Sequence, residues 1–516
     1  MTKKQRYILP LLAMLLLGAP AKAQYDETNN LFYHAIRTPQ TNLLNPALFP
    51  GRNSFYLALP GMDLQFGSPL AINDLLRYDP ATERTTIYVD SLLQKLSQDN
   101  KLRLGFDLQV LGFGLKIKRL FLDANVRLRT SLSVGLPISL FNELVEGNID
   151  NNGETRQMNF LNGDLLNTQS YLETSVGAGW NFEQWNLTAG VHAKMLSGIW
   201  NMQTDRTSIS LKTAPDKEEM TASIYYEMQG SAIVPYDTAK GLIMDSLTDV
   251  NNILHSLLGN NGFALDLGLK YELGPLTLSF SVLDLSPGIH WRKNPFSLSP
   301  VTDTALVLHI KGADVNTFID NGDFTTENFV DELKDRLDSL KLTYRTGDNL
   351  DYWYSLPTKI NVGASLSLST MLRVGLLFHG QFDRGLISKS NPVEGYTAAY
   401  TNTFRWNTTL SASVNLFNWI ELIAGTSIVY DGKHMDLFNP GAGISIAIGT
   451  FFQTYLIGDY TSNIRLVEAK AFNAKFGVNL LIGRGGKKKK IVKEYIPVEP
   501  LPAVDNDGDR PAIEEE

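Results

Sequence analysis

Cysteine is absent from the 516 residues of the chain. This absence excludes a disulfide framework, a thiolate metal site and a cysteine nucleophile. An excess of positive charge is absent as well, because 46 Lys and Arg stand against 54 Asp and Glu, for a net charge of -8. A nucleic-acid partner is therefore not expected. The length allows two or three ordinary domains or one large barrel, and composition does not choose between them.

Long apolar runs and enzyme motifs are also missing. After residue 23 there is no run of 18 apolar residues, and the mean hydropathy is -0.10, unlike a helical membrane protein. The seven histidines are scattered without an H-E-x-x-H motif, and no P-loop or dinucleotide fingerprint occurs. The segment 443–447 lacks the second glycine of a nucleophile elbow. We therefore expect no enzyme activity, no metal and no cofactor.

An export signal is predicted at residues 1–23. It has three basic side chains near its start, an apolar stretch over 8–17 and an A-x-A cleavage sequence at 21–23. The apolar stretch is shorter than the ~20 residues that a membrane-spanning helix needs. The mature chain is expected to begin near Gln24, which is not a lipid-anchored cysteine. An exported chain without a spanning helix is periplasmic, secreted or an outer-membrane barrel.

Alternation of apolar and polar residues is the main structural signal. In 120–136 the even positions run from Leu120 to Leu136 and are almost all apolar, whereas the odd positions include Asp123 and Arg127. A helix would mix these two faces, so the period is 2 and the segment is a long β-strand. Thirteen further segments follow the same pattern: 54–67, 102–110, 172–180, 187–195, 263–271, 275–285, 360–368, 372–382, 404–416, 420–430, 442–449, 452–460 and 472–482. Four weaker candidates, which would raise the count to 16 or 18, lie at 205–212, 220–228, 303–312 and 341–345.

The connections between these segments alternate between short and long. Tight turns are predicted at Lys118-Arg119, Glu183-Gln184, Leu273-Gly274, Ser369-Thr370, Asn418-Trp419 and Thr450-Phe451. Bacterial outer-membrane barrels have tight periplasmic turns and long external loops in this order. The sequence therefore predicts an all-β fold, a closed antiparallel transmembrane β-barrel of about 14 strands (range 12–18) in the outer membrane. Both termini are expected in the periplasm.

Aromatic residues lie where the two membrane interfaces would need them. Trp180 and Trp185 flank one tight turn, and Tyr271 and Tyr430 close apolar faces at strand ends. A soluble, secreted β-sandwich or propeller is the alternative, but the long strands and alternating loops favour the membrane barrel. In a barrel the polar faces line the interior, and the lumen-facing candidates are Arg103, Asp107, Asp123, Arg127, Arg129, Lys194, Arg405 and Lys475.

Short motifs along the chain carry a resemblance to a known family. They are Leu44-Asn45-Pro46-Ala47, Ser281 to Leu285, Ile289-His290-Trp291, Leu356 to Gly363, Asn439-Pro440-Gly441 and Phe476 to Leu480. Over about residues 40–483 the chain resembles an uncharacterised outer-membrane barrel family typical of Bacteroidota, distantly similar to FadL-type and PorV-type barrels. The FadL resemblance implies 14 strands, an N-terminal plug and passive uptake of hydrophobic molecules. The PorV resemblance implies instead a partner in protein export.

Four parts of the chain follow from these observations. They are the signal peptide 1–23, an N-terminal plug-like segment 24–50, the barrel 51–483 and a disordered periplasmic tail 484–516. The turn-forming triplet Asn45, Pro46 and Ala47 belongs to the expected plug. Helical spacing also predicts short loop or rim helices, which lie at 88–98 and 324–341.

The expected function is a passive channel or transporter for small solutes, which are hydrophobic if the FadL resemblance extends to substrate. The alternative is a non-transporting component of an outer-membrane secretion or assembly complex. The expected partners are outer-membrane lipid, a small hydrophobic ligand, and a periplasmic or secretion protein that binds the C-terminal tail. The sequence does not name the solute.

Overall fold

The wall of the molecule is built from long antiparallel strands. They are β1 (Phe55–Ala58) with β2 (Gly61–Gly67), β5 (Lys101–Ile117), β6 (Leu120–Gly135), β8 (Leu166–Phe182), β9 (Leu187–Thr213), β13 (Asn261–Leu273), β14 (Leu276–Trp291), β19 (Thr358–Ser367), β20 (Leu372–Phe382), β21 (Phe404–Leu416), β22 (Ile420–Tyr430), β23 (Met435–Ile448), β24 (Phe452–Gly458) and β25 (Ala471–Ile482).

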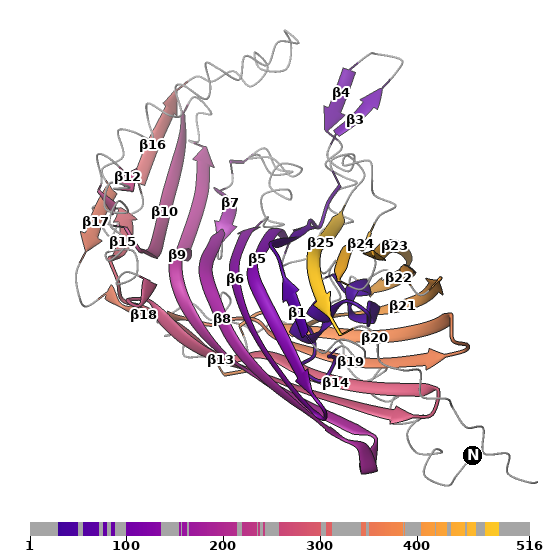
Figure 1. Ribbon diagram of the computed structural model, residues 1–516. Coiled ribbons are helices and arrows are strands. Elements are labelled where there is room, and N and C mark those ends of the chain that lie inside the picture. The colour runs from indigo at the N-terminus through magenta and orange to yellow at the C-terminus, as the bar shows by residue number, and fades with distance from the viewer. Residues whose placement is uncertain are drawn as a thin grey trace, which may run out of the picture.

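This sheet closes on itself in the computed structural model (Figure 1). β1 and β2 together form one wall strand, which pairs with β5 on one side and with β25 on the other. Phe55, for example, lies opposite both Leu115 and Ile482. Closure gives every wall strand two hydrogen-bonded neighbours, as a membrane-spanning sheet requires. The prediction of a closed antiparallel barrel with 14 strands is confirmed.

The structure describes residues 29–49, 55–71, 76–79, 84–87, 100–135, 154–155, 157–162, 165–213, 219–234, 236–237, 241–242, 257–300, 306–311, 342–346, 350–384, 386–387, 404–417, 419–430, 435–448, 451–460 and 470–483. The expected signal peptide, the expected helices at 88–98 and 324–341, and the expected tail 484–516 lie outside these ranges. Within them, no helix is long and apolar enough to cross a membrane. The short 3-10 helices of the described part are η1 (Leu31–His34), η2 (Pro39–Leu43) and η3 (Glu183–Trp185).

β9 continues beyond the barrel into a second set of paired strands. Its pairing with β13 ends at Ser197, and from Trp200 onward its partner on that side is β10 (Glu219–Ala232). β10 also pairs with β15 (Pro295–Pro300) and β16 (Leu306–Lys311), and β15 pairs with β17 (Leu342–Thr346) (Figure 1). We call residues 200–213 of β9 together with β10, β15, β16 and β17 the extension sheet. The four weaker strand candidates lie in the extension sheet, so none of them adds a wall strand.

The other short strands accompany the wall or form small hairpins. They are β3 (Leu76–Asp79), β4 (Arg84–Ile87), β7 (Gln157–Asn162), β11 (Tyr236–Asp237), β12 (Gly241–Leu242) and β18 (Tyr352–Tyr354). β3 pairs with β4 and β11 with β12, whereas β7 pairs with β9 and β18 with β14.

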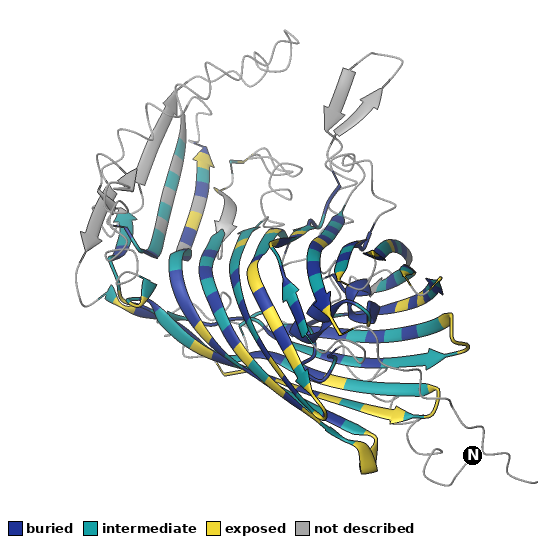
Figure 2. Cartoon of the chain, viewed as in Figure 1, coloured by how far each residue is buried: buried dark blue, intermediate teal, exposed yellow. Residues whose placement is uncertain are grey.

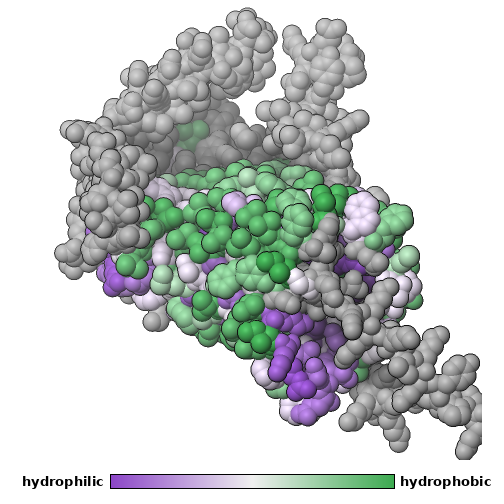
Figure 3. Space-filling view, in the orientation of Figure 1, coloured by the Kyte–Doolittle hydropathy of each residue, from purple (hydrophilic) through white to green (hydrophobic). Residues whose placement is uncertain are grey.

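The barrel is apolar outside and polar inside. On β8 the side chain of Val176 is 59% exposed, whereas Glu173 is 1% exposed. On β6, Leu122 is exposed while Asp123, Asn125 and Arg127 are buried. This alternation repeats along the strands in Figure 2, and Figure 3 shows the resulting apolar belt. A soluble protein buries apolar side chains, so this reversed pattern indicates that lipid surrounds the wall.

The short turns lie together at one end of the barrel. Lys118 and Arg119 join β5 to β6, and Lys118 has a φ of 54°. Gly274, with a φ of 63°, lies in the turn between β13 and β14. The turn between β8 and β9 is longer than the predicted pair of residues, because η3 and the left-handed Asn186 form it. Trp180, Trp185 and Tyr271 are exposed near this end, as interface residues would be.

Candidate functional site

An N-terminal segment, residues 29–49, crosses the interior of the barrel. The backbone N–H of Asn30 donates to Asp459 Oδ2 at 2.6 Å, just after β24. On the opposite wall, six strands away around the ring, Asn45 Nδ2 donates to the carbonyl oxygen of Phe280 on β14 at 3.2 Å. A segment that contacts both walls must lie inside, and most of its side chains are buried.

The triplet Asn45, Pro46 and Ala47 forms a turn against β9 and β13. The backbone N–H of Ala47 donates to Asn45 Oδ1 at 2.9 Å, which closes the turn. Two glycines leave the space for it. A Cβ at Gly190 would lie 2.2 Å from the Pro46 carbonyl oxygen, and a Cβ at Gly268 would lie 2.2 Å from Asn45 Oδ1. Any larger residue at these two positions would displace the segment from the wall.

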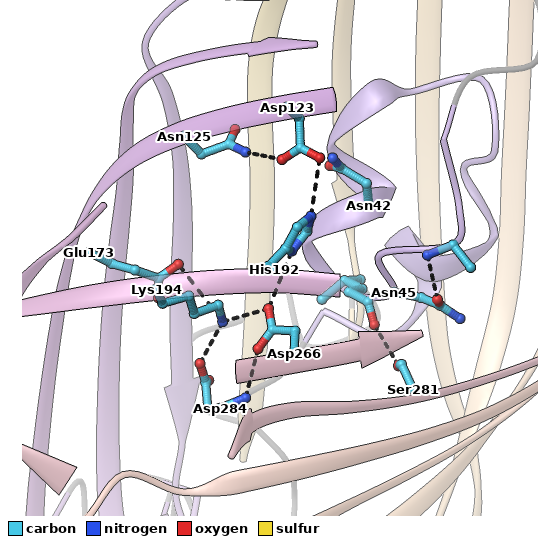
Figure 4. Close-up of polar contacts among 12 residues, drawn as sticks. Asn42, Asn45, Asp123, Asn125, Glu173, His192, Lys194, Asp266, Ser281 and Asp284 are labelled. Carbon is cyan, nitrogen blue, oxygen red and sulfur yellow. Dashed lines mark hydrogen bonds and ion pairs between the residues drawn. The ribbon is translucent and has the colours of Figure 1, made fainter. Parts of the chain in front are cut away.

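Charged side chains from six wall strands form one ion network inside the barrel. Its members are Asp107, Arg127, Arg129, Glu173, Lys194, Asp266 and Asp284. Lys194 on β9 lies at the centre. Its Nζ is 2.6 Å from Asp284 Oδ1, 2.7 Å from Asp266 Oδ2 and 3.8 Å from Glu173 Oε1, and all four side chains are buried (Figure 4).

Two arginines of β6 extend the ion network. Arg127 Nη2 lies 2.5 Å from Glu173 Oε1, and its Nη1 lies 3.1 Å from Asp107 Oδ2. Arg129 Nη1 lies 3.0 Å from Glu173 Oε2 and 3.1 Å from Asp284 Oδ2. Since β14 is four strands away from β6, the last contact reaches across the interior and ties distant parts of the wall together.

His192 connects the ion network to Asp123. Its Nε2 lies 3.3 Å from Asp123 Oδ2, and its Nδ1 lies 3.4 Å from Asp266 Oδ2. Both carboxylates and the imidazole are buried. Figure 4 shows this chain of polar contacts beside Asn42 and Asn45, so the network and the N-terminal segment are neighbours.

Asp284 reaches the interior because β14 contains an extra residue. Leu265 of β13 pairs with Leu285 of β14, whereas Leu267 pairs with Val282. A step of two residues on β13 therefore corresponds to three residues on β14. Asp284 also has a left-handed φ of 55°, and such a β-bulge re-aims the side chain. The backbone N–H of Asp284 donates to Asp266 Oδ1 at 2.8 Å, and this bond holds the Asp266 carboxylate near Lys194.

The lumen-facing candidates from the sequence fall into two groups. The structure brings Asp107, Arg127, Arg129 and Lys194 together in the ion network and joins Asp123 to it through His192. The other three candidates lie elsewhere and are buried: Arg103, Arg405 and Lys475.

Two of these outlying cations have separate partners. Arg405 Nη2 lies 2.8 Å from Asp383 Oδ1. Lys475 Nζ lies 3.0 Å from Asp63 Oδ2 and 4.9 Å from the ring centroid of Phe32 in the N-terminal segment. Lys475 therefore helps to hold the segment at the β25 wall, away from the ion network.

Sequence reasoning missed four side chains that complete the network: Glu173, His192, Asp266 and Asp284. The first three lie on the polar faces of predicted strands, so their inward direction was readable from the alternation. Their pairing was not readable, because it depends on which strands become neighbours. Strict alternation places Asp284 on the lipid-facing side, so its inward direction was not readable from the alternation, because the bulge reverses its face.

An apolar cluster lies next to the ion network, on the side of the extension sheet. It contains Tyr171, Leu196, Ala264, Ile289, Trp291, Tyr352 and Leu356. Along the inner face of β9, Gly190 contacts the N-terminal segment, Lys194 lies in the network, and Leu196 lies in the cluster. Along β9, from the short turn toward the long loops, the interior therefore holds the N-terminal segment, the ion network and the apolar cluster in that order.

The ion network consists of buried charges that neutralise one another. Each ion in the network has an opposite charge within 4 Å, so no nucleophile or general base is left poised for reaction. Across the described ranges, no group of His, Cys, Asp or Glu is arranged to hold a metal ion. The contacts instead brace the wall and surround the N-terminal segment.

Comparisons with known proteins give a family and several distant barrels. The model of a family of unknown function, DUF5723, matches residues 46–459. No curated protein matches the chain. A FadL homologue of Pseudomonas aeruginosa is 9% identical, with 90% of this chain and 100% of that chain covered and a TM-score of 0.40.

Two further solved structures show the range of the similarity. The toluene transporter TbuX of Ralstonia pickettii is 10% identical, with 86% and 92% covered and a TM-score of 0.38. The translocator domain of the autotransporter NalP from Neisseria meningitidis is 8% identical, with 83% and 88% covered and a TM-score of 0.28. The family description names no activity, so a function has to be argued from the barrel itself.

Proposed function

The chain belongs to the DUF5723 family of unknown function, and we propose that it is an outer-membrane channel for small, mainly apolar solutes. In this proposal residues 29–49 are a plug that blocks the interior until it moves. The apolar outer face and the closed wall support the membrane location. The short turns then face the periplasm, together with both termini. No enzymatic step is proposed.

The observation that carries the proposal is the order of layers inside the barrel. The apolar cluster around Trp291 and Leu356 lies toward the long loops, where a solute would enter from outside. Below it, the N-terminal segment blocks the way with hydrogen bonds and packing alone, such as those of Asn30 and Asn45. Non-covalent contacts of this kind can break and re-form, so the segment can act as a removable obstacle.

Deletion of residues 24–50 tests this proposal. The deleted protein, refolded into liposomes, should pass a small apolar solute such as indole and a small sugar faster than the wild-type protein. Heat-modifiable gel mobility should first establish that the deleted protein is folded. If a folded barrel without the segment shows wild-type flux, residues 29–49 are not a plug.

A second candidate is a non-transporting component of a secretion or assembly complex. The filled interior favours it, and so do the large apolar side chains exposed at the short turns, including Met371, Phe417 and Phe451. This candidate predicts that neither the wild-type nor the deleted barrel conducts solutes. The flux measurement therefore separates the two functions.

A further inference from the structure

The N-terminal segment is bonded unequally to the two sides of the barrel. Toward β14 and β19 its polar groups are satisfied. Ser281 Oγ donates to the carbonyl oxygen of Leu44 at 2.8 Å, and Asn361 Nδ2 donates to the same oxygen at 3.0 Å. Toward β21, Asn30 Nδ2 donates to Asn407 Oδ1 at 2.9 Å. Nearer the short turns of β20, β21 and β22, by contrast, several buried polar atoms have no hydrogen-bond partner among the described residues.

These atoms come from one segment and three neighbouring strands. They are His34 Nε2, Arg373 Nη1, Ser413 Oγ, Asn415 Oδ1 and both carboxylate oxygens of Glu421, and we name them the polar seat. His34, Ser413 and Glu421 are at most 4% exposed, and Asn415 is 9% exposed.

Strand register places the members of the polar seat together. Arg373 of β20 lies opposite Ser413 of β21, and Asn415 lies opposite Glu421 of β22. Ser413 and Asn415 are two residues apart and so share a face. Asn415 and Glu421 flank the turn between β21 and β22, so the seat lies at the short-turn end.

Two further contacts bring the N-terminal segment to the same place. A Cβ on Gly375, two residues after Arg373, would lie 2.4 Å from His34 Nδ1. Arg37 of the segment also lies close to the Glu421 carboxylate, and so does Arg373 of β20. Burial, followed by the nearby Arg373 guanidinium, lowers the pKa of His34 to about 4, so its imidazole is neutral at pH 7.

Without water in the polar seat, the burial of these atoms would strongly destabilise the folded protein. Each buried polar atom without a partner loses its hydration and gains nothing in return, and the loss is larger for charged groups. Six such atoms in one place would offset much of the marginal stability of a folded chain. The atoms include acceptors (Glu421, Asn415), a donor (Arg373) and groups that can do either (His34, Ser413). Water matches this mixture, because it both donates and accepts.

We infer that the polar seat is hydrated and forms the passage by which water and small hydrophilic molecules pass the N-terminal segment. The passage runs between η1 and β20 to β22 and opens at the short turns. Arg373 is only partly buried and lies one residue after the start of β20, at the mouth of the passage. The inference goes beyond the proposed channel, because apolar solutes wait for the segment to move, whereas water and small hydrophilic molecules pass it on this side.

Chemical modification of the wild-type protein tests the inference without any flux measurement. Diethyl pyrocarbonate, a small water-borne reagent, acylates neutral imidazole nitrogens. In folded barrels in liposomes, His34 should react at least ten times faster than His192, whose two nitrogens both lie against carboxylates. If His34 reacts as slowly as His192, the seat is dry and the inference is wrong.

Cysteine substitution gives a second measurement, because the chain has no cysteine of its own. Ser413→Cys and Asn415→Cys should react with a small charged methanethiosulfonate at least ten times faster than Ser281→Cys. Ser281 is an equally buried serine that contacts the same segment from the bonded side. Equal rates at positions 413, 415 and 281 would overturn the inference. A barrel that shows the rate difference but no flux of the apolar solute would reject the proposed channel and keep the passage.

Discussion

Lys194→Met removes the central cation of the ion network and should destabilise the barrel strongly. The Lys194 side chain is 3% exposed, and three carboxylates lie within 4 Å of its Nζ. Methionine keeps the length of the side chain but leaves Asp266 and Asp284 without their shortest ion pairs. Breaking a buried pair by removing one partner costs about 3–5 kcal/mol.

The arrangement of neighbouring charges places this variant in that range. The network has four carboxylates and three cations, so the substitution makes its net charge more negative, from -1 to -2. Arg129 still contacts Asp284 and thus limits the loss there, but among the described residues Asp266 keeps only His192 and the backbone N–H of Asp284. We therefore expect a loss of about 3–5 kcal/mol in the free energy of unfolding.

Urea unfolding in lipid vesicles, followed by tryptophan fluorescence, measures this loss. Lys270→Met is the matched control, because Lys270 lies 2.9 Å from Glu272 in a pair whose side chains are 19% and 53% exposed. Exposed pairs contribute about 0–1 kcal/mol, so the control should stay within that range. A loss below about 1 kcal/mol for Lys194→Met would refute the argument that the buried network braces the wall.

Three further predictions test which face of a wall strand contacts lipid, how the N-terminal segment is held against β9, and whether the tail is needed for folding. Leu128→Arg should lower the free energy of unfolding in vesicles by about 2–4 kcal/mol because it places a guanidinium in lipid. Ser131→Arg, on the interior face, should lower it by less than about 1 kcal/mol. Equal losses would contradict the assignment of faces. Gly190→Ala should displace the N-terminal segment and make it more sensitive to added protease. The same change at Gly274 strains only a turn, because the φ there is 63° and a Cβ would meet nothing within 4 Å, so it should leave that sensitivity unchanged. A chain that ends at residue 484 should still migrate as a heat-modifiable folded barrel, and failure to fold would show that the tail is structural.

The wall of the barrel was predictable because lipid and water impose a strict period of 2. Each of the 14 strong alternating segments forms a wall strand, since a residue on the wrong face would place a charge in hydrocarbon or leave a large apolar side chain in the polar interior. The four weaker segments form paired strands outside the ring. Their alternation was less regular because the extension sheet does not separate lipid from an enclosed interior.

Contacts between distant parts of the chain were not predictable in the same way. The ion pair of Arg129 with Asp284 joins residues 155 positions apart, and it forms only once closure has brought β6 and β14 to the same interior. Alternation gives the direction of a side chain but not its height along the barrel axis. Height depends on strand tilt and register, which are properties of the closed sheet.

The bulge in β14 shows how a local departure from alternation can mark the interior site. Strict alternation from Ser281 would direct Asp284 toward lipid, where an unpaired carboxylate is unfavourable. The extra residue and the left-handed φ of Asp284 turn the carboxylate inward instead, to within 3.1 Å of both Lys194 and Arg129. The departure from the pattern is thus stabilised by the ion network, and the network in turn depends on the bulge. A charged residue on the apolar face of a barrel strand is therefore a sequence signal for a bulge, and for a partner inside the barrel.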